Sequence, residues 1–129
     1  MVVVDASVAV EVLLRTSLGQ RIVSNVLHQP RHAPHLIDVE CAHALRRLVR
    51  EKGLHKDLAE VALQNMIAWD LERHSHVPLL SRIWELRDSV TSYDASYIAL
   101  AETLGATLLT CDGRLTRSHG HRAKIVLLS

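Results

Sequence analysis

The chain has 129 residues, of which 48% are hydrophobic and 22% are charged, and this composition excludes a disordered, collagen-like or low-complexity protein. Its length fits one domain, so we expect residues 1–129 to form a single core. The 15 basic and 14 acidic residues leave a formal net charge of +1. Net charge therefore does not drive the protein onto nucleic acid or an anionic membrane, and any such contact must come from local patches.

The cellular compartment is suggested by the cysteines and by the start of the chain. Cys41 and Cys111 are too few for a disulfide framework or a four-thiolate zinc site. The apolar run Val2–Val4 is stopped by Asp5 and follows no basic segment, so it is expected to be neither a signal peptide nor a membrane span. We expect a cytoplasmic protein with no membrane contact.

Strand and helix patterns alternate along the chain. Strands are predicted at residues 2–4, 33–36, 106–111 and 124–128, with a brief edge strand or turn at 76–79. Helices are predicted at residues 6–14, 17–28, 37–52, 56–72, around 83–86 and 95–104, with Gly53 and Gly105 as terminators. This order predicts an α/β sandwich with a mainly parallel sheet of about five strands, which binds ligands at the carboxyl ends of its strands.

Acidic residues stand at several of these ends. Asp5 follows the first strand, Asp112 follows the strand at 106–111, and Asp94 opens the helix before that strand. Glu40 lies at the border of the apolar stripe of the helix at 37–52. Taken singly, Asp5 and Asp94 could be helix caps, and Asp112 before Gly113 could be a turn residue. Glu40 could be an ordinary solvated side chain.

Taken together, the four acids predict a metal site, because the fold brings them to one end of one sheet. Two like charges about 4 Å apart repel by on the order of 4 kcal/mol at an effective dielectric of about 20. Protons or a divalent cation must therefore neutralise the cluster. An oxygen-only donor set suits Mg²⁺ or Mn²⁺.

Four stretches of the chain match a known family pattern: Val3–Ser7, the segment around Val39–Glu40, Ser92–Ala101 and Leu109–Leu115. In this order they resemble the motifs of PIN-domain ribonucleases, and most closely those of the VapC toxins of toxin–antitoxin modules. The third motif followed by the fourth is fairly specific, and the resemblance covers nearly the whole chain. It implies a PIN-like α/β/α sandwich.

The resemblance also implies roles for individual residues. The acidic pocket that holds Mg²⁺ or Mn²⁺ would consist of Asp5, Glu40, Asp94 and Asp112. Asp5 and Asp94 would be the firmest ligands, while Asp112 could act through water. The placement of Glu40 is open, since Asp38 stands two residues away. Ser7 and Thr110 would support the acids by hydrogen bonds.

The expected activity is that of a metal-dependent endoribonuclease, in which an activated water attacks the phosphodiester and leaves a 5′-phosphate and a 3′-hydroxyl. Whether one or two ions act stays open. Basic side chains available for RNA are Arg46, Arg47, Arg50, Lys52, Arg114, Arg117, Arg122 and Lys124. Because the chain has few aromatic residues for base stacking, we expect a structured target such as tRNA or rRNA.

Two kinds of protein partner are expected. The resemblance implies a cognate VapB-like antitoxin whose C-terminal segment lies across the active-site groove. It also favours a homodimer, for which the apolar helices at 6–14 and 56–72 offer surface.

Two other functions, a phosphatase and an inactive binding domain, compete with the ribonuclease. A phosphatase that forms an aspartyl-phosphate needs a second Asp where Ser7 stands. A catalytically inactive PIN-like domain that binds protein or RNA remains the alternative. The pairs His74/His76 and His119/His121 lack further ligands at zinc-site spacing, so we expect surface histidines there.

Overall fold

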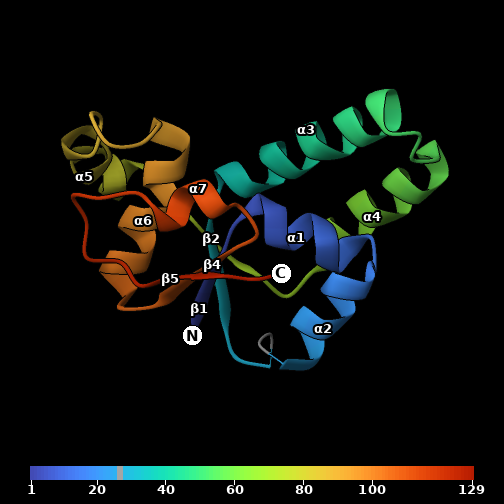
Figure 1. Ribbon diagram of the computed structural model, residues 1–129, viewed down its shortest axis with the longest axis horizontal. Helices are drawn as coiled ribbons and strands as arrows, with labels where there is room; N and C mark the ends of the chain where they lie inside the picture. Colours follow the sequence, from blue (N-terminus) through green and yellow to red (C-terminus); the bar gives the residue numbers. More distant parts are fainter. Residues whose placement is uncertain (26–27) are drawn as a thin grey trace.

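The computed structural model describes residues 1–25 and 28–129, which form a parallel five-stranded sheet with helices on both faces (Figure 1). The strands are β1 (Val2–Val4), β2 (Arg31–Pro34), β3 (Glu72–His74), β4 (Thr107–Thr110) and β5 (Ile125–Leu127). The helices are α1 (Ala6–Leu13), α2 (Ser17–Asn25), α3 (Leu36–Glu51), α4 (Lys56–Ala68), the 3₁₀ helix η1 (Val77–Leu79), α5 (Leu80–Glu85), α6 (Ser92–Leu104) and α7 (Gly113–Thr116).

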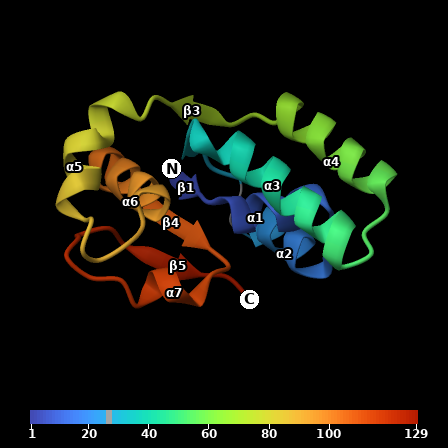
Figure 2. The same cartoon turned by 90° about the horizontal axis from the view of Figure 1, so that it is seen from above.

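The strand order β3-β2-β1-β4-β5 places β1 in the middle, paired in parallel with β2 and β4. Helices α1–α4 lie on one side of the sheet, and α5 and α6 lie on the other (Figure 2). Both faces of β1 are thus covered, which explains why Val2–Val4 is apolar without alternation and is buried throughout. The α/β fold predicted from the sequence is confirmed.

Helix α6 is the most deeply packed helix of the described residues. Ala95–Ala101 is buried at every position, so this helix is enclosed on all sides rather than amphipathic. It begins at the cap Thr91 and ends at Gly105, whose φ of 62° is the left-handed conformation that glycine tolerates. Its rigid first turn carries Asp94. Among the residues described, no helix is long and apolar enough to cross a bilayer.

The predicted element boundaries differ from the structure in several places. The helix predicted to reach Glu72 ends at Ala68, and Glu72 begins the edge strand β3, because Trp69 leaves helical geometry with a ψ of 135°. A brief edge strand or turn was predicted at residues 76–79, and the structure has the 3₁₀ helix η1 there, whose first turn accommodates Pro78. Strand β2 begins at Arg31, two residues before its predicted start. The predicted continuation of α2 over residues 26 and 27 lies outside the described residues.

Close packing of α2 on α1 depends on Gly19. A Cβ at this position would overlap the backbone carbonyl oxygen of Glu11, an atom that cannot move without the helix. We expect Gly19→Ala to lower the free energy of unfolding by about 1–3 kcal/mol, as overpacked cores do, in urea denaturation followed by circular dichroism. Gly113→Ala is the matched control, since its added methyl meets only the Arg117 side chain at 3.7 Å. Equal stability of the two variants would contradict this packing argument.

Candidate active site

Asp5 lies where β1 ends and α1 begins, and its carboxylate is tied to both. Its Oδ1 accepts hydrogen bonds from the Ser7 hydroxyl at 2.6 Å and from the backbone N–H of Val8 at 3.1 Å. Its Oδ2 accepts one from the Thr110 hydroxyl at 2.5 Å. The side chain is only 6% exposed, and burial raises its pKa, although these hydrogen bonds oppose the rise. Asp5 is therefore both the predicted helix cap and a buried carboxylate.

The two hydroxyls next to Asp5 connect β1 to the end of β4. Ser7 accepts a hydrogen bond from the backbone N–H of Cys111 at 2.9 Å. Thr110 accepts one from the backbone N–H of Asp112, also at 2.9 Å. Ser7 and Thr110 thus each join the Asp5 carboxylate to the backbone that follows β4. Burial raises the pKa of the Cys111 thiol to about 11, so this thiol stays protonated and is not a nucleophile at neutral pH.

Glu40 comes from α3 and is held by α6. Its Oε1 accepts a hydrogen bond from the Tyr97 hydroxyl at 2.5 Å. Burial raises the pKa of Glu40; the bond from Tyr97 lowers it, and the negative charges of Asp94 and Asp5 raise it again. The net shift is upward. Glu40 thus responds to the charges of two acids that are far from it in the sequence.

Asp94 is presented by the first turn of α6, where its backbone N–H donates to the Thr91 hydroxyl at 3.1 Å. Its side chain is half-buried. Burial raises the pKa of Asp94, the positive charge of Arg114 lowers it, and the negative charge of Asp112 raises it. The net shift is again upward, so three carboxyl groups here hold their protons more tightly than in water.

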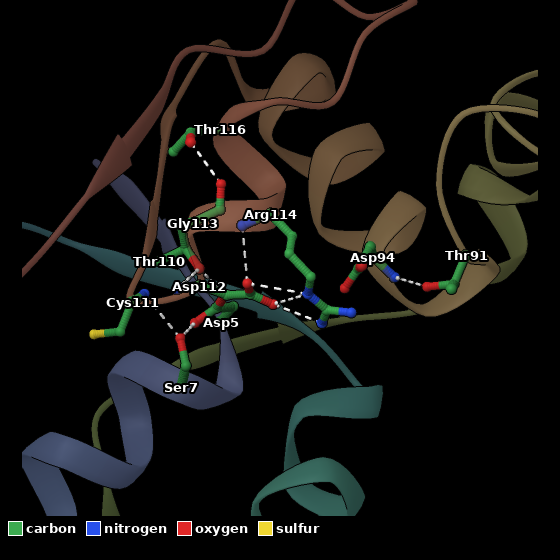
Figure 3. A network of polar contacts seen from close by, with 10 residues as sticks. All are labelled: Asp5, Ser7, Thr91, Asp94, Thr110, Cys111, Asp112, Gly113, Arg114 and Thr116. Carbon is green, nitrogen blue, oxygen red and sulfur yellow. Dashed lines mark hydrogen bonds and ion pairs between the residues drawn. The ribbon is translucent and has the colours of Figure 1, made fainter.

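Asp112 differs from the other three acids because it has a cationic partner. It caps α7, accepting a hydrogen bond from the backbone N–H of Arg114 at 3.0 Å, and its Oδ2 lies 2.7 Å from an Arg114 guanidinium nitrogen. Hydrogen bonding to Arg114 lowers the pKa of Asp112. Figure 3 shows the Arg114 side chain reaching past Asp112 toward Asp94. The predicted turn at Asp112-Gly113 is therefore the start of a short helix.

The four acids are linked by charge, since Glu40 is affected by Asp5 and Asp94, and Asp94 by Asp112, but they do not form a tight cage. In the part of the chain that the structure describes, no three of them offer oxygen atoms within 4.8 Å of one another. Mg²⁺ commonly retains several waters and takes only one or two protein carboxylates directly. An open arrangement of carboxylates suits such an ion better than a closed protein cage does.

The choice between Glu40 and Asp38 follows from their contacts. Arg73 donates to both oxygens of Asp38, at 3.0 and 2.8 Å, and its other nitrogens donate to backbone carbonyls of Leu71 and Met66. Asp38 therefore binds α3 to β3 and already has a cationic partner in Arg73. The sequence interpretation missed Tyr97 as the partner of Glu40 and Arg114 as the partner of Asp112, since each contact depends on three-dimensional packing.

A groove of about 920 Å³, which only Glu40 of the four acids lines, runs along α1 and α3. Its polar end includes Ser7, Glu40 and Cys111, and its far end includes Arg47 and Lys52. A second depression, of about 560 Å³, brings Asp94 together with Arg114 and Arg117. Arg122 and Lys124, also predicted for RNA contact, instead lie with Gly105 at the opposite end of α6, which is about 17 Å along the helix from Asp94.

Comparison with known proteins places these features in a family. The sequence matches the PIN domain over residues 2–119. It is 39% identical to ribonuclease VapC12 of Mycobacterium tuberculosis over 129 residues, which is all of both chains. It is 40% identical to ribonuclease VapC9 of the same organism over 116 residues, covering 90% of this chain and 89% of that one.

A solved structure shares the fold. VapBC2 from Rickettsia felis, bound to a DNA fragment from their promoter, superposes with a TM-score of 0.72 over 100% of both chains at 13% sequence identity. The sequence identity to ribonucleases over the whole length of the chain, the match to the PIN domain and the shared fold all indicate the same family. The chain therefore belongs to the PIN-domain family, within its VapC ribonucleases, the toxins of VapBC toxin–antitoxin modules.

Proposed function

We propose that this VapC protein is an Mg²⁺- or Mn²⁺-dependent endoribonuclease whose site consists of Asp5, Glu40, Asp94 and Asp112. The observation that carries the proposal is that Asp5, Glu40 and Asp94, from different elements, are buried or half-buried and form no ion pair within the described residues, and burial raises the pKa of each. Burying carboxylates without nearby cations is unfavourable, and a divalent ion would relieve it.

The donor chemistry of the site fits such an ion. Asp5, which caps α1, and Asp94, in the first turn of α6, would hold the ion directly, with waters completing its shell. A divalent ion bound there would lower the pKa of a bound water and neutralise charge on the phosphate oxygens. Glu40, fixed by Tyr97, would orient the attacking water. Attack on phosphorus with loss of the 3′ oxygen leaves a 5′-phosphate and a 3′-hydroxyl.

The RNA would be held by basic side chains on both sides of the acids. Arg47 and Lys52 line the groove on one side, while Arg114 and Arg117 line the depression on the other. Phosphates bound at both places would span the carboxylates between them. We propose a structured RNA such as tRNA or rRNA as the substrate, since few aromatic side chains are available to stack single-stranded bases.

The same groove suits the antitoxin. Val39 is 70% exposed and lines the groove with Tyr93 and Leu48, so an apolar segment of a VapB-like antitoxin could bury them beside Glu40. A homodimer is also proposed, through Leu58 and Val61, which lie three residues apart on α4 and are both exposed. The apolar face of α1 is not available for it, because α1 packs on α2 and α3. With RNA as its substrate, the protein would act in the cytoplasm.

The acids are tested by isosteric substitution. Asp5→Asn and Asp94→Asn should each reduce Mg²⁺- or Mn²⁺-dependent RNA cleavage at least about a hundredfold, because a ligand of the ion is lost. Asn can still accept the hydrogen bond of a helix cap, so circular dichroism and the melting temperature should stay near wild type. The exposed Asp57→Asn is the control. Equal cleavage by all three variants would refute the role of Asp5 and Asp94, and a wild-type protein that cleaves no RNA would favour an inactive, partner-binding domain.

Arg114 is expected to have opposite effects on metal and RNA binding. Arg114→Ala removes a positive charge 2.7 Å from Asp112, so Mn²⁺ should bind more tightly. The same change removes a phosphate contact, so RNA should bind more weakly and with a smaller salt dependence. Calorimetry with Mn²⁺ and RNA binding by the cleavage-deficient Asp94→Asn form measure the two effects. Lys124→Ala should change neither, and weaker Mn²⁺ binding by Arg114→Ala would refute this role.

Glu40 should make the metal-free protein less stable as pH rises. The pKa of Glu40 in the folded protein lies above its unfolded value of about 4.3, so folding favours the protonated carboxyl group. The free energy of unfolding therefore falls as the pH rises from the unfolded pKa to the folded one. Glu40→Gln keeps an oxygen for Tyr97 but cannot ionise. In EDTA, it should melt a few degrees higher than wild type at pH 8, with the gap closing near pH 4. The exposed Glu60→Gln should show no such gap; a gap independent of pH would count against the ionisation of Glu40.

A further inference from the structure

A second group of potential metal ligands lies at the β3 edge of the sheet, apart from the four acids. His32 on β2 pairs in register with Glu72 on β3, and His74 follows two residues later. Residues two apart on a strand face the same way, as do residues paired across parallel strands. All three side chains therefore lie on one face, while the intervening Arg73 turns to the opposite face to bind Asp38.

The ligand atoms are close together. His32 Nδ1 lies 2.9 Å from His74 Nε2 and 3.4 Å from Glu72 Oε2. Within residues 1–25 and 28–129, this is the only group of three His, Cys, Asp or Glu side chains whose ligand atoms lie within 4.8 Å of one another. Tetrahedral zinc with Zn–N bonds of about 2.0–2.1 Å separates its ligand atoms by roughly 3.4 Å. An ion would need only small side-chain movements to fit.

The burial of the group leaves one side open. His32 is buried, at 8% exposure, and His74 is half-buried, so their rings are held by the sheet. The Glu72 side chain is 68% exposed and faces solvent. Burial lowers the pKa of His32, which favours the neutral imidazole that a metal requires. Two imidazoles and one carboxylate with an open fourth position form a donor set that zinc sites use.

We propose that His32, Glu72 and His74 bind a borderline divalent cation such as Zn²⁺, with water as the fourth ligand. Imidazole nitrogens select Zn²⁺ over Mg²⁺, whereas the carboxylate site has only oxygen donors. The two sites would therefore take different ions.

The bound ion would fasten β3 to β2 and steady the start of α3. The backbone N–H of His35 donates to the carbonyl of His74 at 2.8 Å, and the N–H of Leu36 donates to His76 Nε2 at 2.9 Å. Glu40 follows one turn later on α3. An ion at the strand pair would thus stabilise the folded protein and the segment from which α3 begins.

The test uses full-length, tag-free protein with Mg²⁺ in excess to occupy the carboxylates. Wild-type protein should bind one equivalent of Zn²⁺ in calorimetry, melt at higher temperature with Zn²⁺, and give the intense visible spectrum of tetrahedral Co²⁺. His74→Ala and Glu72→Gln should each weaken Zn²⁺ binding at least about tenfold and reduce the Co²⁺ bands. Glu72→Gln changes only an exposed side chain, so it keeps the test valid if His74→Ala is unstable. His119→Ala, an exposed histidine elsewhere, is the matched control.

The proposal is overturned if wild-type protein gives no tetrahedral Co²⁺ spectrum, or if Glu72→Gln binds Zn²⁺ as tightly as wild type. It does not rest on the nuclease activity. Asp94→Asn should abolish RNA cleavage and still bind Zn²⁺ at the strand pair, so failure of one proposal is distinguishable from failure of the other.

Discussion

The hydrogen bonds around the buried carboxylate of Asp5 hold the site in place. One oxygen binds the start of α1 through Ser7 and Val8, and the other binds the end of β4 through Thr110. The same Thr110 hydroxyl accepts from the backbone N–H of Asp112, so one acid fixes the backbone that carries another. Parallel strands bring their ends to one edge, and these side chains convert that closeness into a fixed geometry.

The distribution of charge around this edge follows from burial. Asp5, Glu40 and Asp94 lie deep enough that lost hydration raises their pKa values, while Asp112 lies near the surface beside Arg114 and has a lowered pKa. Arg114 pairs with Asp112 at the rim, and its charge also lowers the pKa of Asp94, whereas the three acids at the centre form no ion pair within the described residues. An incoming divalent ion would neutralise the centre, and the rim arginine would be free to meet phosphate.

The parts of the fold and site that the sequence could predict are those set by local pattern. A β-branched run stopped by Asp5, or a capped helix closed by Gly105, can be recognised from neighbouring residues alone. Tyr97 could not be paired with Glu40, since 57 residues separate them. No glycine or proline marks the end of helix α4, and Leu71 continues the apolar spacing of that helix. The sequence alone therefore does not indicate that strand β3 follows. Nothing in the local sequence tells whether Asp38 or Glu40 belongs to the acidic site. The difference lies in Arg73, which comes from β3 and binds Asp38.

The short edge strand explains why two different donor sets can exist in so small a protein. Near the centre of the sheet, Asp5 and Asp112 follow the ends of β1 and β4 and offer only oxygen donors. At the β3 edge, the register of β2 and β3 brings two imidazoles together on one face of the sheet. His32 and His74 are spaced by the register of the strands, as Asp5 and Asp112 are spaced by their ends. Sheet geometry therefore determines which ligands meet, and their chemistry determines which ion each place can bind.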